Sequence, residues 1–180
     1  MTARAVFLDR DGVINRALVL SGRPYPPSGP SELKILPGVH DAIGRLRGAG
    51  FRLIVVTNQP DVARGTQTRE AVEALHTKLK TELALDEFCV CYHDDADRCQ
   101  CRKPSPGLLL GAALNTGVDL RASYLVGDRW RDIEAGRRAG CATIFIDHGY
   151  AERRPSGFDA KVTSLLEASE WILRTIKESR

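Results

Sequence analysis

The chain has 180 residues, of which 43% are hydrophobic and 27% are charged, a composition typical of one globular domain with a sizeable core. Its formal net charge of +3 does not indicate the dense basic stripe that nucleic-acid binding uses, and no run of about 18 apolar residues is present to span a membrane. The N-terminal Met1-Thr2-Ala3-Arg4 lacks the apolar core of a secretion signal. We therefore expect a cytoplasmic protein in which residues 1–180 form a single domain.

The first third of the chain predicts two strands, a long loop and a helix. Residues 3–8 predict a short buried strand that ends at Asp9. Residues 16–36 hold several prolines and glycines without a clear period, so we expect a long loop with little regular structure, which is usually functional. Pro37-Gly38 then opens a helix, and the run rich in β-branched residues at 51–56 predicts a second strand.

The rest of the chain continues this alternation. Thr68 is a suitable N-cap for a helix whose apolar stripe extends to Leu83, and we expect His76 on this helix to lie at the surface. The later predicted elements are a strand at 88–92, a helix at 105–114 begun by Ser105 and Pro106, a strand at 123–126, a helix to about 139, a strand at 142–146 and a helix at 164–177. Alternating strands and helices indicate an α/β, Rossmann-like doubly wound fold, with a mainly parallel sheet covered by helices on both faces.

Polar residues follow several of these strands at the point where each strand ends. They are Asp9 and Asp11 after the first strand, Thr57 and Asn58 after the second, Lys103 shortly after the third, and Asp128 and Asp132 after the fourth. Ligands of open parallel sheets bind beyond the carboxyl ends of the strands, so we expect these side chains to converge on one site. Aspartate and asparagine are also common turn residues, so the combined order and spacing indicate the site rather than any single residue.

The residue types in this set suit phosphate chemistry. Three carboxylates close together need a cation, and hard oxygen ligands favour Mg²⁺, which also binds substrate phosphate. A carboxylate can attack phosphorus and form an acyl-phosphate. A second carboxyl group two residues on can protonate the leaving oxygen and then deprotonate the attacking water. A lysine and a hydroxyl can neutralise and orient the phosphoryl oxygens.

Four segments resemble, in the same order, the motifs of the haloacid dehalogenase (HAD) superfamily. They are Phe7-Leu8-Asp9-Arg10-Asp11-Gly12-Val13-Ile14-Asn15, Val55-Val56-Thr57-Asn58-Gln59, Arg102-Lys103-Pro104 and Val126-Gly127-Asp128-Arg129-Trp130-Arg131-Asp132. The resemblance covers residues 6 to about 147. It implies a phosphatase rather than a dehalogenase, because the dehalogenases lack the second aspartate of the first motif.

The resemblance also implies a role for each matching position. Asp9 is expected to be the nucleophile, and Asp11 the general acid and base whose backbone carbonyl ligates Mg²⁺. Asp128 is expected to be the second carboxylate on Mg²⁺, and Asp132 to support the metal site from just behind it. Thr57 and Lys103 are expected to bind the transferring phosphate, with Asn58 nearby.

A second group of residues has the spacing of a zinc site. Cys91, His93, Cys99 and Cys101 form C-x-H-x5-C-x-C within a loop at about 89–103. Three thiolates and an imidazole complete a tetrahedral Zn²⁺ site with no open position, so we expect structural zinc that holds the loop carrying Lys103. Cys89 is expected to be a packed residue of the third strand, although it could replace Cys91 as a ligand.

This zinc loop resembles that of the heptose-1,7-bisphosphate 7-phosphatases and of the related histidinol-phosphate phosphatases, both of which have almost no cap domain. The Gly-Val-Ile-Asn end of the first motif and Ala63-Arg64-Gly65 resemble the heptose enzymes, whereas Arg23-Pro24-Tyr25-Pro26-Pro27 and Pro60-Asp61-Val62 depart from them near the expected site mouth. The favoured substrate is thus a small phosphorylated sugar, a heptose bisphosphate. The alternatives are histidinol phosphate, or a catalytically silent zinc-stabilised interaction module.

Arg102, next to Lys103, is a candidate ligand for a second substrate phosphate, because a guanidinium binds phosphate in a bidentate manner. The alternative is a surface arginine that covers the zinc loop. A site with so little cap can work in a monomer, which is the state that the sequence favours. His148, after the last predicted strand, is a further candidate for lining the site.

Overall fold

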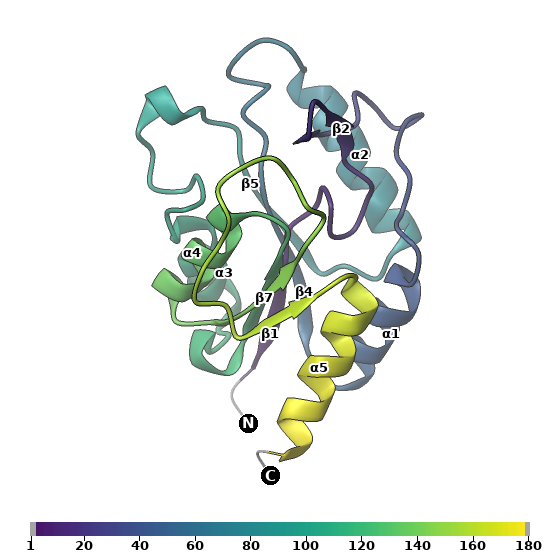
Figure 1. The fold of residues 1–180 in the computed structure, drawn as a ribbon, viewed down its shortest axis with the longest axis vertical. Coiled ribbons are helices and arrows are strands. Elements are labelled where there is room, and N and C mark those ends of the chain that lie inside the picture. Colours follow the sequence, from purple (N-terminus) through teal and green to yellow (C-terminus); the bar gives the residue numbers. More distant parts are fainter. Residues whose placement is uncertain (1–2, 179–180) are drawn as a thin grey trace.

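The computed structural model describes residues 3–178, so Met1 and Thr2, the start of the N-terminal segment considered above, lie outside the described residues. A sheet runs through the centre of the molecule, between helices (Figure 1). It has six strands in the order β5-β4-β1-β6-β7-β8, and all neighbouring strands are parallel. Its strands are β1 (Ala5–Leu8), β4 (Arg52–Asn58), β5 (Glu87–Cys91), β6 (Tyr124–Gly127), β7 (Ala142–Ile146) and β8 (Ala160–Val162). Within the described range no helix is long and apolar enough to cross a membrane.

Helices cover both faces of this sheet (Figure 1). The side chains of α1 (Val39–Gly48), α2 (Arg69–Glu82) and α5 (Leu165–Glu178) join the hydrophobic cluster on one face. Those of α3 (Gly107–Thr116) and α4 (Trp130–Ala139) join the cluster on the other. The architecture is the doubly wound α/β fold that the alternation of patterns predicted.

The first strand shows how the core holds the catalytic edge in place. Val6 and Leu8 belong to one hydrophobic cluster, Ala5 and Phe7 belong to the other, and all four are fully buried. Strand side chains alternate between faces, so both faces of β1 are anchored, and burying each large side chain contributes about 1.5–3 kcal/mol. Asp9 directly follows this anchored strand, and its backbone N–H donates to the carbonyl of Val126 in β6 at 3.0 Å.

The region 16–36 contains more regular structure than its sequence predicted. Leu18–Leu20 (β2) and Arg23–Tyr25 (β3) pair as an antiparallel hairpin. Ser21 and Gly22 connect them with φ angles of 50° and 76°, the left-handed conformation that a two-residue hairpin turn requires. The hairpin was missed because Pro24 and the three-residue strands obscure the period, whereas the rest of the region has little regular structure, as expected. This hairpin and α1 are the only named elements of the described chain between β1 and β4.

Two further elements differ from the sequence expectations. The sixth strand, β8, was not predicted, because Ala-Lys-Val is too short to show a period. Helix α3 begins at Gly107 with Pro106 as its N-cap, rather than with Ser105 as the cap. The backbone N–H of Ser105 donates to the carbonyl of Arg102 at 2.9 Å, which places Ser105 in a turn before the helix.

His76 is buried, with 8% of its surface exposed, although it was expected at the surface. It follows Val72 by four positions on α2, so both side chains lie on the face turned to the sheet. Its ring stacks on Phe88 of β5 with 4.9 Å between ring centroids. Because histidine is a polar residue type, the hydrophobic pattern alone predicted His76 on the exposed face of the helix, although it lies on the buried face.

Candidate active site

The carboxyl ends of β1, β4 and β6 meet where the strand order changes direction, which is where open parallel sheets bind ligands. The loops that follow these three strands and β5 line a cavity of about 270 Å³. The cavity is lined by all the residues predicted for catalysis and for phosphate or magnesium binding, namely Asp9, Asp11, Thr57, Asn58, Arg102, Lys103, Asp128 and Asp132. Segments far apart in the sequence thus meet at one edge of the sheet.

Lys103 lies at the centre of the cluster with only 2% of its side chain exposed. Its Nζ donates to Asp9 Oδ1 at 2.8 Å, to Asp132 Oδ1 at 2.6 Å and to the backbone carbonyl of Val56 at 2.7 Å. These three bonds use all the donors of the ammonium group. The lysine is therefore fixed beside Asp9, where a transferring phosphoryl group would need a positive charge.

Burial and mutual repulsion set the charge balance of the carboxylates. Burial and the nearby charge of Asp132 raise the pKa of Asp9 to about 6, although Lys103 opposes the rise. Burial, followed by the charges of Asp9 and Asp132, raises the pKa of Asp128 well above its usual range. Burial disfavours the charge of Lys103, but the two carboxylates beside it outweigh burial and raise the pKa of the ammonium group. With all three carboxylates ionised, the cluster would hold more negative charge than its single lysine can balance.

The two carboxylate oxygens of Asp128 are buried and accept no well-formed hydrogen bond from the described residues, although the Tyr150 hydroxyl lies beside them. A buried, unpartnered carboxylate is costly unless a ligand completes its coordination. Gly12 leaves the room for it, because a Cβ built there would collide with Asp128 Oδ2. Gly12 also has a φ of 82°, which favours glycine.

Asp9, Asp128 and Asp132 each place a carboxylate oxygen within 4.8 Å of the others. The oxygens of Asp132 are already engaged, since Oδ1 accepts from Lys103 and Oδ2 accepts from the backbone N–H of Arg129 at 3.0 Å. This arrangement fits the supporting place expected for Asp132. It leaves Asp128 and Asp9 as the side chains directed at a cation.

Asp11 lies two residues after Asp9, on the loop that follows β1, but different neighbours hold its carboxylate. Oδ1 accepts from Arg10 Nε at 3.2 Å and from Asn15 Nδ2 at 2.9 Å. Oδ2 accepts from Arg10 Nη2 at 2.9 Å and from Gln59 Nε2 at 3.0 Å. Although burial opposes the charge, the Arg10 guanidinium and these hydrogen bonds lower the pKa of Asp11.

Thr57 and Asn58 follow β4 and differ in what they contact. The Thr57 hydroxyl accepts from Gln59 Nε2 at 2.8 Å and lines the cavity. Asn58 also lines the cavity, but its amide pairs with the backbone of Lys103, donating to the carbonyl and accepting from the N–H, each at 3.0 Å. Asn58 therefore holds the backbone of the lysine, which was not evident from the sequence.

Arginines form the outer part of the cavity. Arg102 Nε donates to Asp95 Oδ1 at 2.8 Å, and Arg131 Nη1 donates to the same oxygen at 3.0 Å. Asp95 thus holds two guanidinium groups side by side at the mouth. Arg64, also lining the cavity, binds Asp94 through Nη2 at 2.7 Å.

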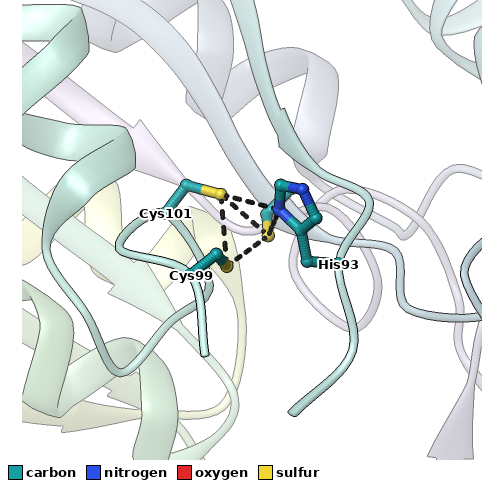
Figure 2. Close-up of side chains that lie close together, drawn as sticks. His93, Cys99 and Cys101 are labelled. Atoms are coloured by element: carbon teal, nitrogen blue, oxygen red, sulfur yellow. Dashed lines mark hydrogen bonds between the residues drawn. The ribbon is translucent and has the colours of Figure 1, made fainter. Parts of the chain in front are cut away.

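The predicted zinc ligands come together as a compact set (Figure 2). Cys101 Sγ lies 3.1 Å from Cys91 Sγ and 3.5 Å from Cys99 Sγ, and His93 Nδ1 lies 3.3 Å from Cys101 Sγ. Thiolates on a tetrahedral Zn²⁺ at about 2.3 Å lie about 3.8 Å apart, so the four donor atoms need only small shifts to hold the ion. Cys89 lies outside the set, so Cys91 is the ligand that the geometry favours.

Several residues of the site were missed or left undecided by the sequence. Arg10 and Asn15 are fully buried behind Asp11, and Gln59 links Asp11 to Thr57. They lie within the motifs, yet only the fold shows that they contact Asp11. His148 does not line the cavity; its Nε2 lies 2.7 Å from the carbonyl of Gly12.

Comparison with known proteins identifies the family. The chain is 37% identical over 154 residues to the D-glycero-beta-D-manno-heptose-1,7-bisphosphate 7-phosphatase of Bordetella bronchiseptica, a match covering 81% of this chain and 82% of that protein. It is 37% identical over 187 residues to the enzyme of the same name from Yersinia pestis, covering 97% and 92%. This chain belongs to the HAD phosphatase family. A family model described as "HAD-hyrolase-like" also matches residues 100–168 of the phosphatase.

The fold of this HAD phosphatase is close to that of a solved relative. It superposes with a TM-score of 0.82 and 32% identity on the crystal structure of D,D-heptose 1,7-bisphosphate phosphatase from B. bronchiseptica, complexed with magnesium and phosphate. The match covers 96% of the chain described here and 99% of the B. bronchiseptica chain. The resemblance drawn from the four motifs is therefore confirmed, and so is the enzyme class.

Proposed function

We propose that this phosphatase removes the 7-phosphate of D-glycero-D-manno-heptose 1,7-bisphosphate through a magnesium-dependent reaction at Asp9. The observation that carries the proposal is the buried cluster of Asp9, Lys103 and Asp128 at the sheet edge, in which the Asp128 oxygens accept no well-formed hydrogen bond from the described residues. The names of the relatives supply the substrate, and the little-covered cavity with arginines at its mouth is compatible with a sugar bisphosphate.

In the first half of the proposed reaction, an Asp9 carboxylate oxygen attacks phosphorus and the bond from phosphorus to the sugar oxygen breaks. Asp11 enters this half in its protonated form and gives that proton to the leaving oxygen. Because Arg10, Asn15 and Gln59 favour its charged form, this step requires substrate binding to weaken those contacts. The positive charge of Lys103, fixed 2.8 Å from Asp9, offsets the charge of the phosphoryl oxygens, and Lys103 can donate to one of them once Asp9 Oδ1 gives up its hydrogen bond in the attack. The Thr57 hydroxyl, which lines the cavity, orients the same oxygens. The product is an aspartyl-phosphate on Asp9 and the free sugar hydroxyl.

In the second half, water attacks phosphorus while Asp11 accepts its proton, and the bond from phosphorus to Asp9 breaks. Inorganic phosphate leaves and the carboxylate of Asp9 is restored. Asp11 suits this step because Arg10 and Gln59 donate to its oxygens and hold it as an acceptor. Asn58 keeps Lys103 in position through both halves of the reaction, because its side-chain amide pairs with the Lys103 backbone.

The residues fit a magnesium ion. Asp9 and Asp128 are the carboxylates that would hold it, together with the backbone carbonyl of Asp11, and Asp132 would support them from its bonds to Lys103 and Arg129. Hard oxygen ligands and the surplus negative charge of the cluster are what Mg²⁺ prefers. When bound, the ion would neutralise phosphoryl charge and orient the substrate.

Arg102 is proposed to bind the second phosphate of the bisphosphate. Its side chain lines the cavity and is 10% exposed, and Asp95 holds it next to Arg131. A guanidinium pairs with phosphate through two parallel hydrogen bonds, which lysine cannot provide. The alternative of a purely structural arginine predicts no difference between mono- and bisphosphate substrates.

The Cys91, His93, Cys99 and Cys101 set is proposed to hold structural zinc. The backbone N–H of Arg102 donates to Cys99 Sγ at 3.4 Å, so the proposed zinc site directly contacts the segment that carries Arg102 and Lys103. Burial tends to raise the pKa of Cys99, but this N–H and the neighbouring thiols lower it to about 7, which favours the thiolate that binds metal. Elemental analysis of the purified protein should find one zinc per chain.

The substrate is tested by phosphate release with Mg²⁺ on both anomers of heptose-1,7-bisphosphate, histidinol phosphate and simple sugar monophosphates. A strong preference for a heptose bisphosphate supports the proposal. A preference for histidinol phosphate, or equal activity across the panel, overturns the heptose assignment but keeps the reaction type. No release from any member, with Mg²⁺ present, also overturns the heptose assignment and places the substrate of the phosphatase outside this panel.

A further inference from the structure

His76 and Arg10 form a buried polar pair directly behind Asp11. Arg10 is fully buried, and its Nη1 lies 3.0 Å from His76 Nε2. Arginine has no acceptor, so Nε2 accepts this hydrogen bond and the ring hydrogen lies on Nδ1. Burying a guanidinium is costly unless its donors are satisfied, and His76 and Asp11 together satisfy the two ends of this one.

The contact with His76 fixes which way the guanidinium faces. With Nη1 held by the histidine, Arg10 Nε and Nη2 are the donors left for Asp11, and both bind it, at 3.2 Å and 2.9 Å. The carboxylate cannot rotate without breaking this fork. Every contact that Asp11 receives is donated to it, so the arrangement fits the step in which Asp11 accepts the proton of water.

His76 is itself held firmly. It lies on the core face of α2, and its ring stacks on Phe88 of the neighbouring strand β5. The chain of contacts from α2 through Arg10 to Asp11 thus connects the packed core to the reacting group. Glu73, one turn earlier on α2, and Arg10 and Asp11 are the charged groups that act on His76.

We propose that His76 is a positioning residue which, through Arg10, holds the Asp11 carboxylate in place to deprotonate the water that cleaves the aspartyl-phosphate. The inference rests on the proposed roles of Asp9 and Asp11. In that step the water oxygen bonds to phosphorus, the bond from phosphorus to Asp9 breaks, and the water proton passes to Asp11. Loosening Asp11 therefore slows the release of phosphate more than the transfer of phosphate to Asp9.

The test uses His76→Met, which replaces the ring nitrogen with a much weaker acceptor at similar volume, and His76→Gln, which keeps a strong acceptor. With p-nitrophenyl phosphate and Mg²⁺, we expect His76→Met to lower kcat about tenfold, a part of the roughly 10²–10⁴-fold that general acid–base groups supply. KM should fall with kcat, so kcat/KM stays nearly constant, and a burst of p-nitrophenolate should precede the steady state. The Gln variant should recover most of kcat, and the matched exposed variant His40→Met should behave as the wild type.

Two results overturn the inference: a fall in kcat/KM equal to that in kcat, or a Gln variant as slow as the Met variant. If the Met variant does not fold, Arg10→Lys gives the same test, because it keeps the buried charge and removes the fork. Asp11→Asn separates this inference from the proposed function. Full activity in Asp11→Asn overturns the role of Asp11 itself, whereas an inactive Asp11→Asn with an unaffected His76→Met overturns only the inference.

Discussion

Gly12→Ala should damage the active site far more than it destabilises the fold. Gly12 has a φ of 82°, and a non-glycine residue in this region costs about 1–2 kcal/mol. For a domain of this size that loss lowers Tm by about 2–8 °C. The added Cβ would also collide with Asp128 Oδ2, so the carboxylate must move. A displacement of about 1 Å in a positioned group can cost about 100-fold in rate, and we expect a loss of that order.

Gly140→Ala is the matched control for this change. Gly140 has a φ of 85° at the end of α4, and a Cβ built there meets nothing within 4 Å. Both variants therefore carry the backbone strain, and only Gly12→Ala disturbs Asp128. The assay is kcat as a function of Mg²⁺ concentration, with Tm measured on the same samples. The reasoning is refuted if both variants lose the same activity and need the same Mg²⁺ concentration.

Three other predictions concern the arginine, the zinc loop and Asp9. Arg102→Gln should raise KM for a sugar bisphosphate at least tenfold and change KM for a monophosphate little. The control Arg45→Gln, on the exposed side of α1 where Arg45 pairs with Glu170, should affect neither substrate. Equal effects of Arg102→Gln on both substrates contradict the second-phosphate role. Cys99→Ser should bind less than one zinc per chain and lower Tm, and an unchanged zinc content and Tm would exclude Cys99 as a ligand. The pKa of Asp9 is raised from 3.8 to about 6, so Asp9 binds its proton more tightly in the folded state than in the unfolded state. The folded state therefore loses stability as pH rises through about 6. Without metal, Asp9→Asn should therefore be more stable than the wild type at pH 8, by at most about 3 kcal/mol. Mg²⁺ should strongly stabilise only the wild type. Denaturant unfolding at pH 4 and pH 8 measures both effects, and an Asp9→Asn variant that is no more stable than the wild type at pH 8 contradicts the burial argument.

The five longer strands of the central sheet and the residues that follow them were predictable, because β-branched runs and strand-end polar residues are local signals. Asp9 and Asp128 follow buried strands, and the parallel order of those strands places both at one edge. The proposed zinc ligands were equally predictable from the sequence, since they lie within residues 91–101 and the structure brings their donor atoms together. In these cases a short stretch of sequence and the topology together determine where the side chain lies.

The features that were missed depend on contacts between distant segments. His76 reads as a surface residue of an amphipathic helix until α2 is packed against β5 and brought to Arg10. Asn58 reads as a phosphate ligand until the third motif loop folds over β4 and offers its backbone. The hairpin at 18–25 is stabilised by a turn with two positive φ angles, which Ser21 gives little reason to expect.

The central claim is that Asp9 carries the phosphoryl group. It is tested most directly by quenching the enzyme with acid during turnover with Mg²⁺, treating it with hydroxylamine and locating the product by peptide mass spectrometry. Hydroxylamine attacks the acyl carbon of an aspartyl-phosphate, releases phosphate and leaves a hydroxamate on that residue. The account predicts a hydroxamate at Asp9 that is absent without substrate. A hydroxamate at another aspartate, or none in an enzyme that is turning over, would contradict it.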